Sequence, residues 1–116
     1  MKVLYDSLEQ IMKEEYDRAT ERFGLYHNTP SEAYGVILEE AEESEEAVIR
    51  MKNELAFFWR YVRENDDSKS IDAAKEIMHA ALLGACELIQ TAAMAYKAQQ
   101  GYSKIHTWPA KTPRRF

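Results

Sequence analysis

The chain contains few residues that favour a change of direction: it has 4 glycines and 3 prolines among 116 residues. A many-stranded β protein needs frequent turns, and glycine and proline are the residues that most often mark them. Turn-favouring segments occur at 24–30, at 65–70 and after Gly101. The sequence therefore predicts an all-α fold built from a few long helices.

Three stretches between these turns carry apolar residues at helical spacing, which predicts helices at about 3–23, 30–64 and 69–100. The second has a clear start, because Thr29 is followed by Pro30 at the first helical position and by Glu32 three residues after the cap. The third is expected to start near Ser68 or Ser70. We expect one all-α domain over 1–100, an antiparallel bundle of three main helices in which the two long helices form a hairpin.

Two apolar surfaces bear on how these helices pack. A stripe on the second helix is expected to face the core: Tyr34, Ile37, Leu38, Ala41, Val48, Leu55, Trp59 and Val62. The third helix is rich in alanine, and between Ile77 and Tyr96 its only residue charged at neutral pH is Glu87. A helix that is apolar all round is buried on several sides. Because one short chain cannot cover it, we expect a homo-oligomer, most simply a two-fold dimer that forms a larger bundle.

Composition narrows the classes of partner and compartment. Lys and Arg total 15 against 20 for Asp and Glu, a net charge of −5, so nucleic acid is not an expected partner. A single cysteine cannot form an internal disulfide, and the first residues become charged before an apolar signal-peptide run can form; both favour the cytoplasm. Polar residues within the third helix argue against a membrane span: His79, Glu87, Gln90 and Thr91.

The tail, 101–116, differs in character, because it contains basic residues and no acidic one. Such a segment is typical of a solvated or subunit-crossing extension. An arm that contacts phosphate or RNA is the alternative.

Residues 31–49 contain seven acidic residues and no basic one: Glu32, Glu39, Glu40, Glu42, Glu43, Glu45 and Glu46. A solvated helix face is the ordinary interpretation of such a run. Its like charges repel by roughly 0.2–0.5 kcal/mol per pair, which a cation would relieve, and Mg²⁺ is the usual ion for clustered carboxylates. At about 100° per residue, Glu40 and Glu43 border an apolar strip, whereas Glu42 and Glu46 lie in the middle of the polar face. We therefore favour Glu40 and Glu43 as the functional pair.

A hairpin that turns near residue 65 places residues equidistant from the turn side by side. Glu87 then comes level with Glu43, and Gln90 level with Glu40, whereas Glu76 lies further along the helix. A lone carboxylate among apolar neighbours is costly unless it is paired or binds a metal, so we expect Glu87 to join the acidic site. The alternative is a buried structural glutamate satisfied by Lys97, Arg50 or a tyrosine.

The segment Leu38-Glu39-Glu40-Ala41-Glu42-Glu43 resembles the L-E-E-x-x-E signature of the all-α NTP pyrophosphohydrolases, the MazG-like and dimeric dUTPase-like group. Glu87-Leu88-Ile89-Gln90 stands at the mirror position, where the family has E-x-x-D. The resemblance covers most of 29–100, and the segment after Gln90 looks like that of small phage-encoded members. Two differences from the family are the Gln at position 90 and a longer separation between the two motifs.

This resemblance implies a cytoplasmic enzyme that hydrolyses a nucleoside triphosphate to the monophosphate and pyrophosphate with Mg²⁺ or Mn²⁺. It implies that the catalytic residues are Glu40, Glu43 and Glu87. The implied metal ligands are Glu39, Glu40, Glu43, Glu87 and, as a neutral donor, Gln90. Lys97 is the implied contact to the substrate phosphates. A related bundle with weakened or lost catalysis, acting as a binding or structural dimer, is the alternative.

Overall fold

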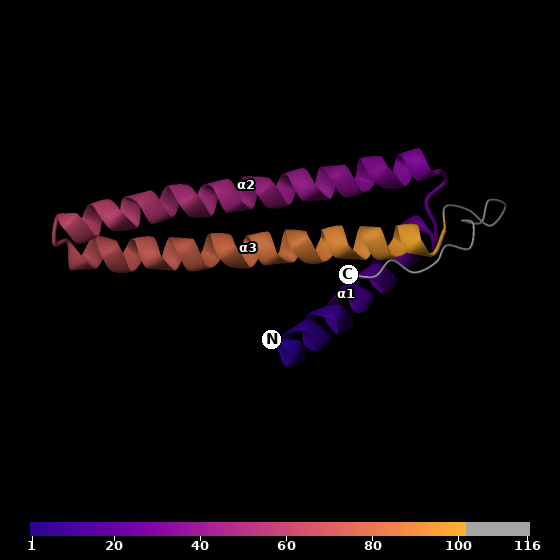
Figure 1. Cartoon of the computed structure of the whole chain (residues 1–116), viewed down its shortest axis with the longest axis horizontal. Helices are drawn as coiled ribbons and strands as arrows, with labels where there is room; N and C mark the ends of the chain where they lie inside the picture. Colours follow the sequence, from indigo (N-terminus) through magenta and orange to yellow (C-terminus); the bar gives the residue numbers. More distant parts are fainter. Residues whose placement is uncertain (102–116) are drawn as a thin grey trace. The chain divides into compact units, whose positions relative to one another are not determined.

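The structure, a computed structural model, describes residues 1–101 and is 88% helical there, with no strands in this range. It contains three helices, α1 (Lys2–Phe23), α2 (Pro30–Arg63) and α3 (Asp67–Gln99) (Figure 1). The predicted all-α class with three main helices is confirmed. The predicted basic tail lies outside the described residues, apart from Gly101.

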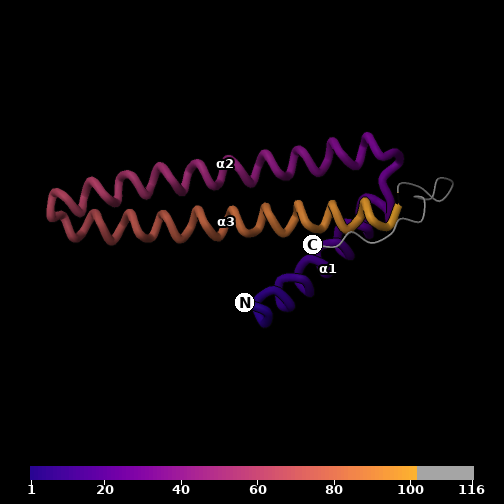
Figure 2. The backbone as a smooth tube through the Cα atoms, viewed as in Figure 1, coloured from indigo at the N-terminus to yellow at the C-terminus, as the bar shows by residue number. Residues whose placement is uncertain are grey.

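The chain divides into two compact units. Among the described residues, the first consists of Met1–Ile37 and 92–101, and the second is Leu38–Thr91. The second unit contains the greater part of α2 and α3, which run antiparallel and are joined by a single turn (Figure 2). All three residues predicted to be catalytic belong to this second unit.

The start of α2 has the Thr29 cap that the sequence predicts, although the return bond from Glu32 reaches one residue before the cap. The Thr29 side-chain oxygen accepts a hydrogen bond from the Glu32 backbone N–H at 3.0 Å. The Glu32 carboxylate reaches back and accepts from the backbone N–H of Asn28 at 3.3 Å. One backbone donor of the first helical turn and one donor just before the helix are thereby paired.

The turn between α2 and α3 explains why the hairpin reverses at residue 65. Asn65 has φ 55°, in the left-handed region that asparagine tolerates better than most residues. Its N–H donates to the Val62 carbonyl at 3.1 Å, and the Asp66 N–H donates to the Tyr61 carbonyl at 3.0 Å. This pair of bonds is a Schellman motif, which ends a helix by satisfying its last carbonyl groups.

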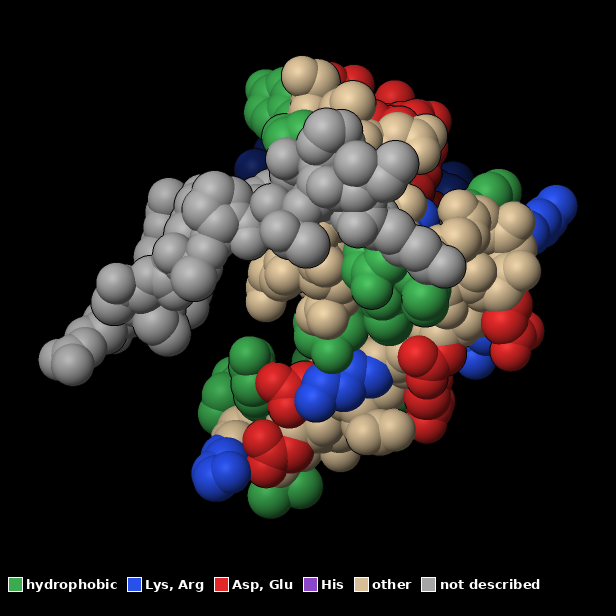
Figure 3. Space-filling model, turned by 90° about the vertical axis from the view of Figure 1, so that its right-hand side faces the viewer, with side chains coloured by type: hydrophobic (Ala, Val, Ile, Leu, Met, Phe, Trp, Pro, Cys, Tyr) green, Lys and Arg blue, Asp and Glu red, His purple; other side chains and the backbone are tan. Residues whose placement is uncertain are grey.

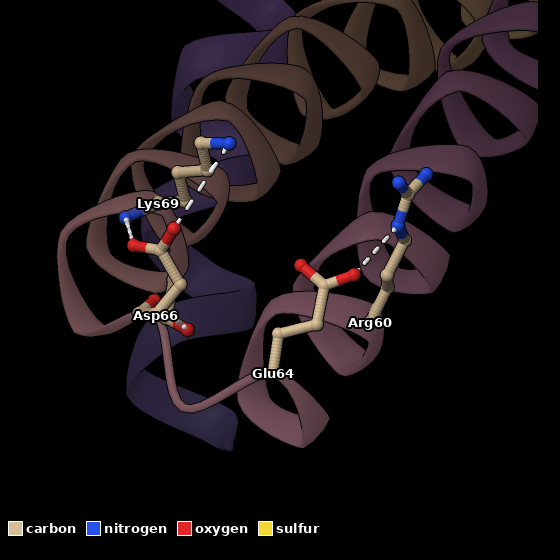
Figure 4. A network of polar contacts seen from close by, with 5 residues as sticks. Arg60, Glu64, Asp66 and Lys69 are labelled. Carbon is tan, nitrogen blue, oxygen red and sulfur yellow. Dashed lines mark hydrogen bonds and ion pairs between the residues drawn. The ribbon is translucent and has the colours of Figure 1, made fainter.

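Asp66 ends this turn and also begins the next helix. Its carboxylate accepts from the backbone N–H of Lys69 at 3.0 Å, and α3 therefore starts at Asp67, slightly before the predicted serine starts. Figure 4 shows the surrounding ion pairs, Lys69 with Asp66 at 4.0 Å and Arg60 with Glu64 at 3.2 Å. The turn thus occupies the position near residue 65 on which the predicted alignment depends.

Within the second unit, α2 and α3 pack along a seam that repeats every three or four residues. On α2 the residues shielded from solvent are Glu40, Ser44, Ala47, Met51, Glu54, Phe58 and Tyr61. On α3 the shielded positions include Ser70, Ala73, Ile77, Ala80, Gly84, Glu87 and Thr91. This spacing is typical of two helices that pack as a coiled coil. The helices approach closely at Gly84: a Cβ added to this glycine would lie only 3.3 Å from the Cβ of Ala47.

The prediction of the α2 core stripe is wrong for most of its members. Seven of its eight members are exposed, all except the half-buried Ile37: Tyr34, Leu38, Ala41, Val48, Leu55, Trp59 and Val62. The hydrophobic residues that are buried in 1–101 are all alanines: Ala33, Ala73, Ala80, Ala93 and Ala98. The physical reason is that α3 packs on another face of α2, where the small residues Ser44 and Ala47 meet Thr91 and Gly84 and permit a close approach.

The third helix is also largely uncovered within the single chain. By length and composition α3 could cross a membrane, a property that core helices of soluble proteins share. Only 17% of its most apolar 18-residue stretch is buried, and Met78, Leu82 and Leu88 are among its exposed side chains. Hydrophobic side chains also lie at the surface beside charged ones on the face shown in Figure 3. The expected burial of α3 on several sides is therefore not provided by one chain.

Candidate functional site

Three carboxylates from α2 and α3 meet at one level of the hairpin. Glu40, Glu43 and Glu87 each offer an oxygen atom, and these atoms lie within 4.8 Å of one another. Glu40 and Glu43 are close to one turn apart on α2, and Glu87 comes from α3. Glu40 and Glu87 are half-buried, and Glu43 is exposed. The structure thus brings together the three residues that the resemblance implies to be catalytic.

The register of the seam accounts for this meeting. Glu40 and Glu87 occupy seam positions, so their side chains start between the helices instead of on the solvent face. Glu76, the competing candidate on α3, forms an ion pair with Arg50 at 3.6 Å. The alternative interpretation, in which Arg50 satisfies Glu87, is not what the structure shows.

Two carboxylate oxygens of the cluster are buried without a hydrogen-bond partner, Oε2 of Glu40 and Oε2 of Glu87. A buried acceptor that is left unpaired costs about 1–3 kcal/mol. A cation or a hydrogen-bond donor that contacts these two atoms would therefore remove this free-energy cost. Carboxylate oxygens are also the ligands that Mg²⁺ and Mn²⁺ prefer, so the residues present suit such an ion.

The crowding of these acids changes their proton affinity. Burial raises the pKa of Glu40, with further increases from the charges of Glu43 and Glu87. A hydrogen bond to Glu87 raises the pKa of Glu43, followed by burial and by the charge of Glu87. Both shifts favour the protonated form, although burial is the main cause at Glu40 and the neighbouring Glu87 carboxyl is the main cause at Glu43.

The remaining predicted ligands lie at the margin of this cluster. Glu39 is exposed on α2 and is not one of the three clustered carboxylates. Its charge contributes to the raised pKa of the neighbouring Glu40. Gln90 is half-buried on α3, one turn after Glu87. Glu42 and Glu46 are exposed, as their place on the polar face predicts.

Lys97 belongs to a different group of residues, in the first unit. It is 5% exposed, and burial lowers its pKa, while the charge of Glu32 opposes that shift. His27 is 2% exposed, and its pKa is lowered by burial and then by the charge of Lys97. The sequence interpretation missed this partnership, for which the only signal was a histidine within the turn before the Thr29 cap.

A second feature missed from the sequence is a pair of hydroxyl groups beside the cluster. Ser44 and Thr91 each follow a clustered glutamate by four residues, Glu40 and Glu87 respectively. Their oxygens are 3.3 Å apart across the seam. The signal that could have identified them is this identical spacing on both helices.

No protein-family model, characterised protein or solved structure significantly matches the chain. The function must therefore be inferred from the residues and their geometry.

Proposed function

We propose that this protein is a Mg²⁺-dependent nucleoside triphosphate pyrophosphohydrolase of the MazG-like type, which converts an NTP to the monophosphate and pyrophosphate. The observation that supports this proposal is the meeting of Glu40, Glu43 and Glu87 within 4.8 Å, from two helices and at mirror positions of one hairpin. The two unpartnered buried oxygens in the cluster favour a cation over a purely structural arrangement.

In this proposal Glu40, Glu43 and Glu87 hold the metal, with Glu39 and Gln90 at the edge of the site. When bound, Mg²⁺ or Mn²⁺ supplies a Lewis acid for the triphosphate and lowers the pKa of a coordinated water. The task of this chain is to hold three carboxylates together against their repulsion. Gln90 contributes a neutral oxygen where the family has an anionic one, so the site has one negative charge fewer.

We also propose that the protein is a homodimer, acting in the cytoplasm. The exposed strip on α2, which includes Val48, Leu55 and Trp59, supports this proposal. The uncovered apolar surface of α3 supports it as well. Contiguous apolar surface of this kind is typical of protein–protein interfaces. A second copy would bury both strips.

The enzymatic proposal is tested by measuring pyrophosphate release from a panel of NTPs and dNTPs with Mg²⁺ or Mn²⁺. Glu43→Gln should lower the rate by at least about 100-fold, since even groups that only support a metal ligand are worth about 10–100-fold. Glu46→Gln is the matched control, because it removes the same charge from an exposed position on the same helix. Absence of release from every substrate, or equal rates for both variants, would contradict the proposal.

The second candidate is a binding or structural dimer with weakened or lost catalysis. Gln90 at the position of an expected acid favours it, and so does the extent of the exposed apolar surface. Gln90→Asp separates the two candidates. A large gain in pyrophosphate release would identify the natural protein as a weakened enzyme, whereas no release from either form would favour the binding role.

A further inference from the structure

Two hydroxyl groups lie in the seam between α2 and α3, beside the carboxylate cluster. Ser44 Oγ and Thr91 Oγ1 are 3.3 Å apart, and Ser44 is 4% exposed. Ser44 Oγ is also 2.9 Å from the carbonyl oxygen of Glu40, and Thr91 Oγ1 is 2.9 Å from that of Glu87. Each hydroxyl therefore contacts the main chain of one clustered glutamate, and the two hydroxyls contact each other.

The two hydroxyl groups have two protons for three contacts, so only two of the contacts can be hydrogen bonds at the same time. A hydroxyl group has one proton to donate and two lone pairs to accept with. At any moment one hydroxyl can donate across the seam while the other donates to the carbonyl of its own helix. Either arrangement ties α2 to α3 and leaves both buried oxygens with a partner, which buried polar groups require.

This contact distinguishes the observed register from a register shifted by one turn. The seam has small residues at several levels, among them Ala73, Ala80 and Gly84, so a shifted α3 would still present small residues to α2. The shift would move Glu87 by about 5.4 Å relative to Glu40 and Glu43. It would also separate the two hydroxyls, and a polar contact between two packed helices is known to fix register in this way.

We propose that Ser44 and Thr91 are positioning residues of the metal site, and that their contact holds α2 and α3 in the register that brings Glu87 to Glu40 and Glu43. This inference rests on the metal site of the proposed function. Neither hydroxyl touches the metal or the substrate; both act through the backbone of the residues that do.

The experiment titrates the full-length protein with Mn²⁺ and follows the free ion by electron paramagnetic resonance. Thr91→Val and Ser44→Ala should each weaken Mn²⁺ binding by about 10-fold, the usual effect of removing a group that supports a ligand. Thr91→Ser keeps the hydroxyl and should stay within about twofold of the natural protein. The double variant should bind no more weakly than the single ones, because both changes remove the same contact.

Ser70→Ala is the matched control. Ser70 Oγ donates to the Asp66 carbonyl at 2.8 Å, the same type of bond as in Ser44, at the turn end of the seam. This variant should lose some thermal stability and keep its Mn²⁺ affinity. Affinities are compared at a temperature at which circular dichroism shows every variant folded, and Ser44→Ala provides the test if Thr91→Val does not fold.

The outcomes separate the two proposals. If the natural protein binds Mn²⁺ saturably and both Thr91→Val and Ser44→Ala bind it equally well, the positioning role is contradicted and the metal site stands. A natural protein without saturable Mn²⁺ binding contradicts the metal site and the positioning role together. Equal weakening by Thr91→Ser and Thr91→Val also contradicts the role of the hydroxyl.

Discussion

At the scale of the single residue, Glu43 illustrates a conflict between stability and function. It is exposed, and yet its pKa is raised, because it lies against the Glu87 carboxyl group, which can share a proton with it and whose charge repels its own. The folded protein therefore binds protons more tightly at the cluster than the unfolded chain does. In the absence of metal, this contribution to stability grows as the pH falls from neutrality towards 4.5, and it is lost as the pH rises through the raised pKa values.

Glu43→Gln should consequently raise the melting temperature of the metal-free protein at pH 7 while it abolishes the stabilisation produced by Mn²⁺. The substitution removes one of three crowded charges and one metal ligand at the same time. Differential scanning calorimetry with and without Mn²⁺ measures both effects, with Glu46→Gln as the control. A lower melting temperature for metal-free Glu43→Gln would contradict the repulsion inferred from the structure.

His27 has the opposite linkage, and it lies in the first unit. Its pKa is lowered by burial and by Lys97, while Glu32 and a backbone contact with Met94 act to raise it. The unfolded chain therefore binds a proton near pH 6.5 that the folded protein does not bind. The stability that neutral His27 supports is complete above pH 6.5 and falls as the pH drops below that value.

We expect this unit to loosen in mild acid, by up to about 1.4 kcal/mol per pH unit for the one proton involved. Amide hydrogen exchange at Asn28 and Glu32, measured between pH 7.5 and 5.5, follows the capping bonds next to His27. His27→Gln should remove most of this pH dependence, after correction for the intrinsic exchange rates. An unchanged pH dependence in that variant would show that another group is responsible.

At the scale of the structural element, the hairpin shows how far the sequence can predict this structure. The scarcity of turn residues and the Thr29 cap predict the helices, and the turn near residue 65 aligns Glu87 with the acids of α2. The face of α2 that meets α3 was not predictable in the same way. Hydrophobicity favours the strip with Leu55 and Trp59, whereas the helices pack on a mixed face, on which the small residue Ala47 lies against Gly84. The contact between Lys97 and His27 was not predictable either, because His27 lies in the loop before α2, where no helical periodicity indicates which side chains are buried.

The turn itself supplies a prediction at this scale. Asn65 occupies the left-handed region, in which a residue such as alanine is disfavoured by about 1–2 kcal/mol. Asn65→Ala should destabilise the protein by roughly 1 kcal/mol, and Asn65→Gly should be neutral or stabilising. Urea unfolding measures both. If alanine and glycine are equivalent at this position, the left-handed turn is not the conformation in solution.

At the scale of the whole molecule, the hydrophobic residues that the described chain buries fully are alanines, and most of its large hydrophobic residues are exposed. The hydrophobic effect is roughly proportional to the apolar area removed from water, so alanines alone provide little stabilisation. Burial of the exposed strips of α2 and α3 against another chain would therefore add to the stability of the fold. The proposed dimer would bury both strips.

Sedimentation should show a dimer at micromolar concentration. Leu82, which is 60% exposed on α3, is suited to a test, because Leu82→Lys places a charge on the apolar surface without entering the seam. This variant should shift the protein towards the monomer by at least about 10-fold in dissociation constant, the effect of 1.4 kcal/mol. Gln99→Lys adds the same charge at an exposed position near the end of α3 and should remain dimeric. A natural protein that sediments as a monomer would contradict the proposal.

The single turn between α2 and α3 also determines which changes in chain length the site can tolerate. Each helix contributes one arm, the segment between the carboxylate cluster and Asn65. Whether Glu87 lies level with Glu43 depends on the difference in length between the two arms, and the length that they share can change. Seven residues added to each arm between the cluster and Asn65 would return every side chain to nearly the same face. The same insertion in one arm would displace Glu87 by about 10 Å from its partners. The long interval between the two acidic motifs in this sequence is thus compatible with an intact site, because both arms have the same length.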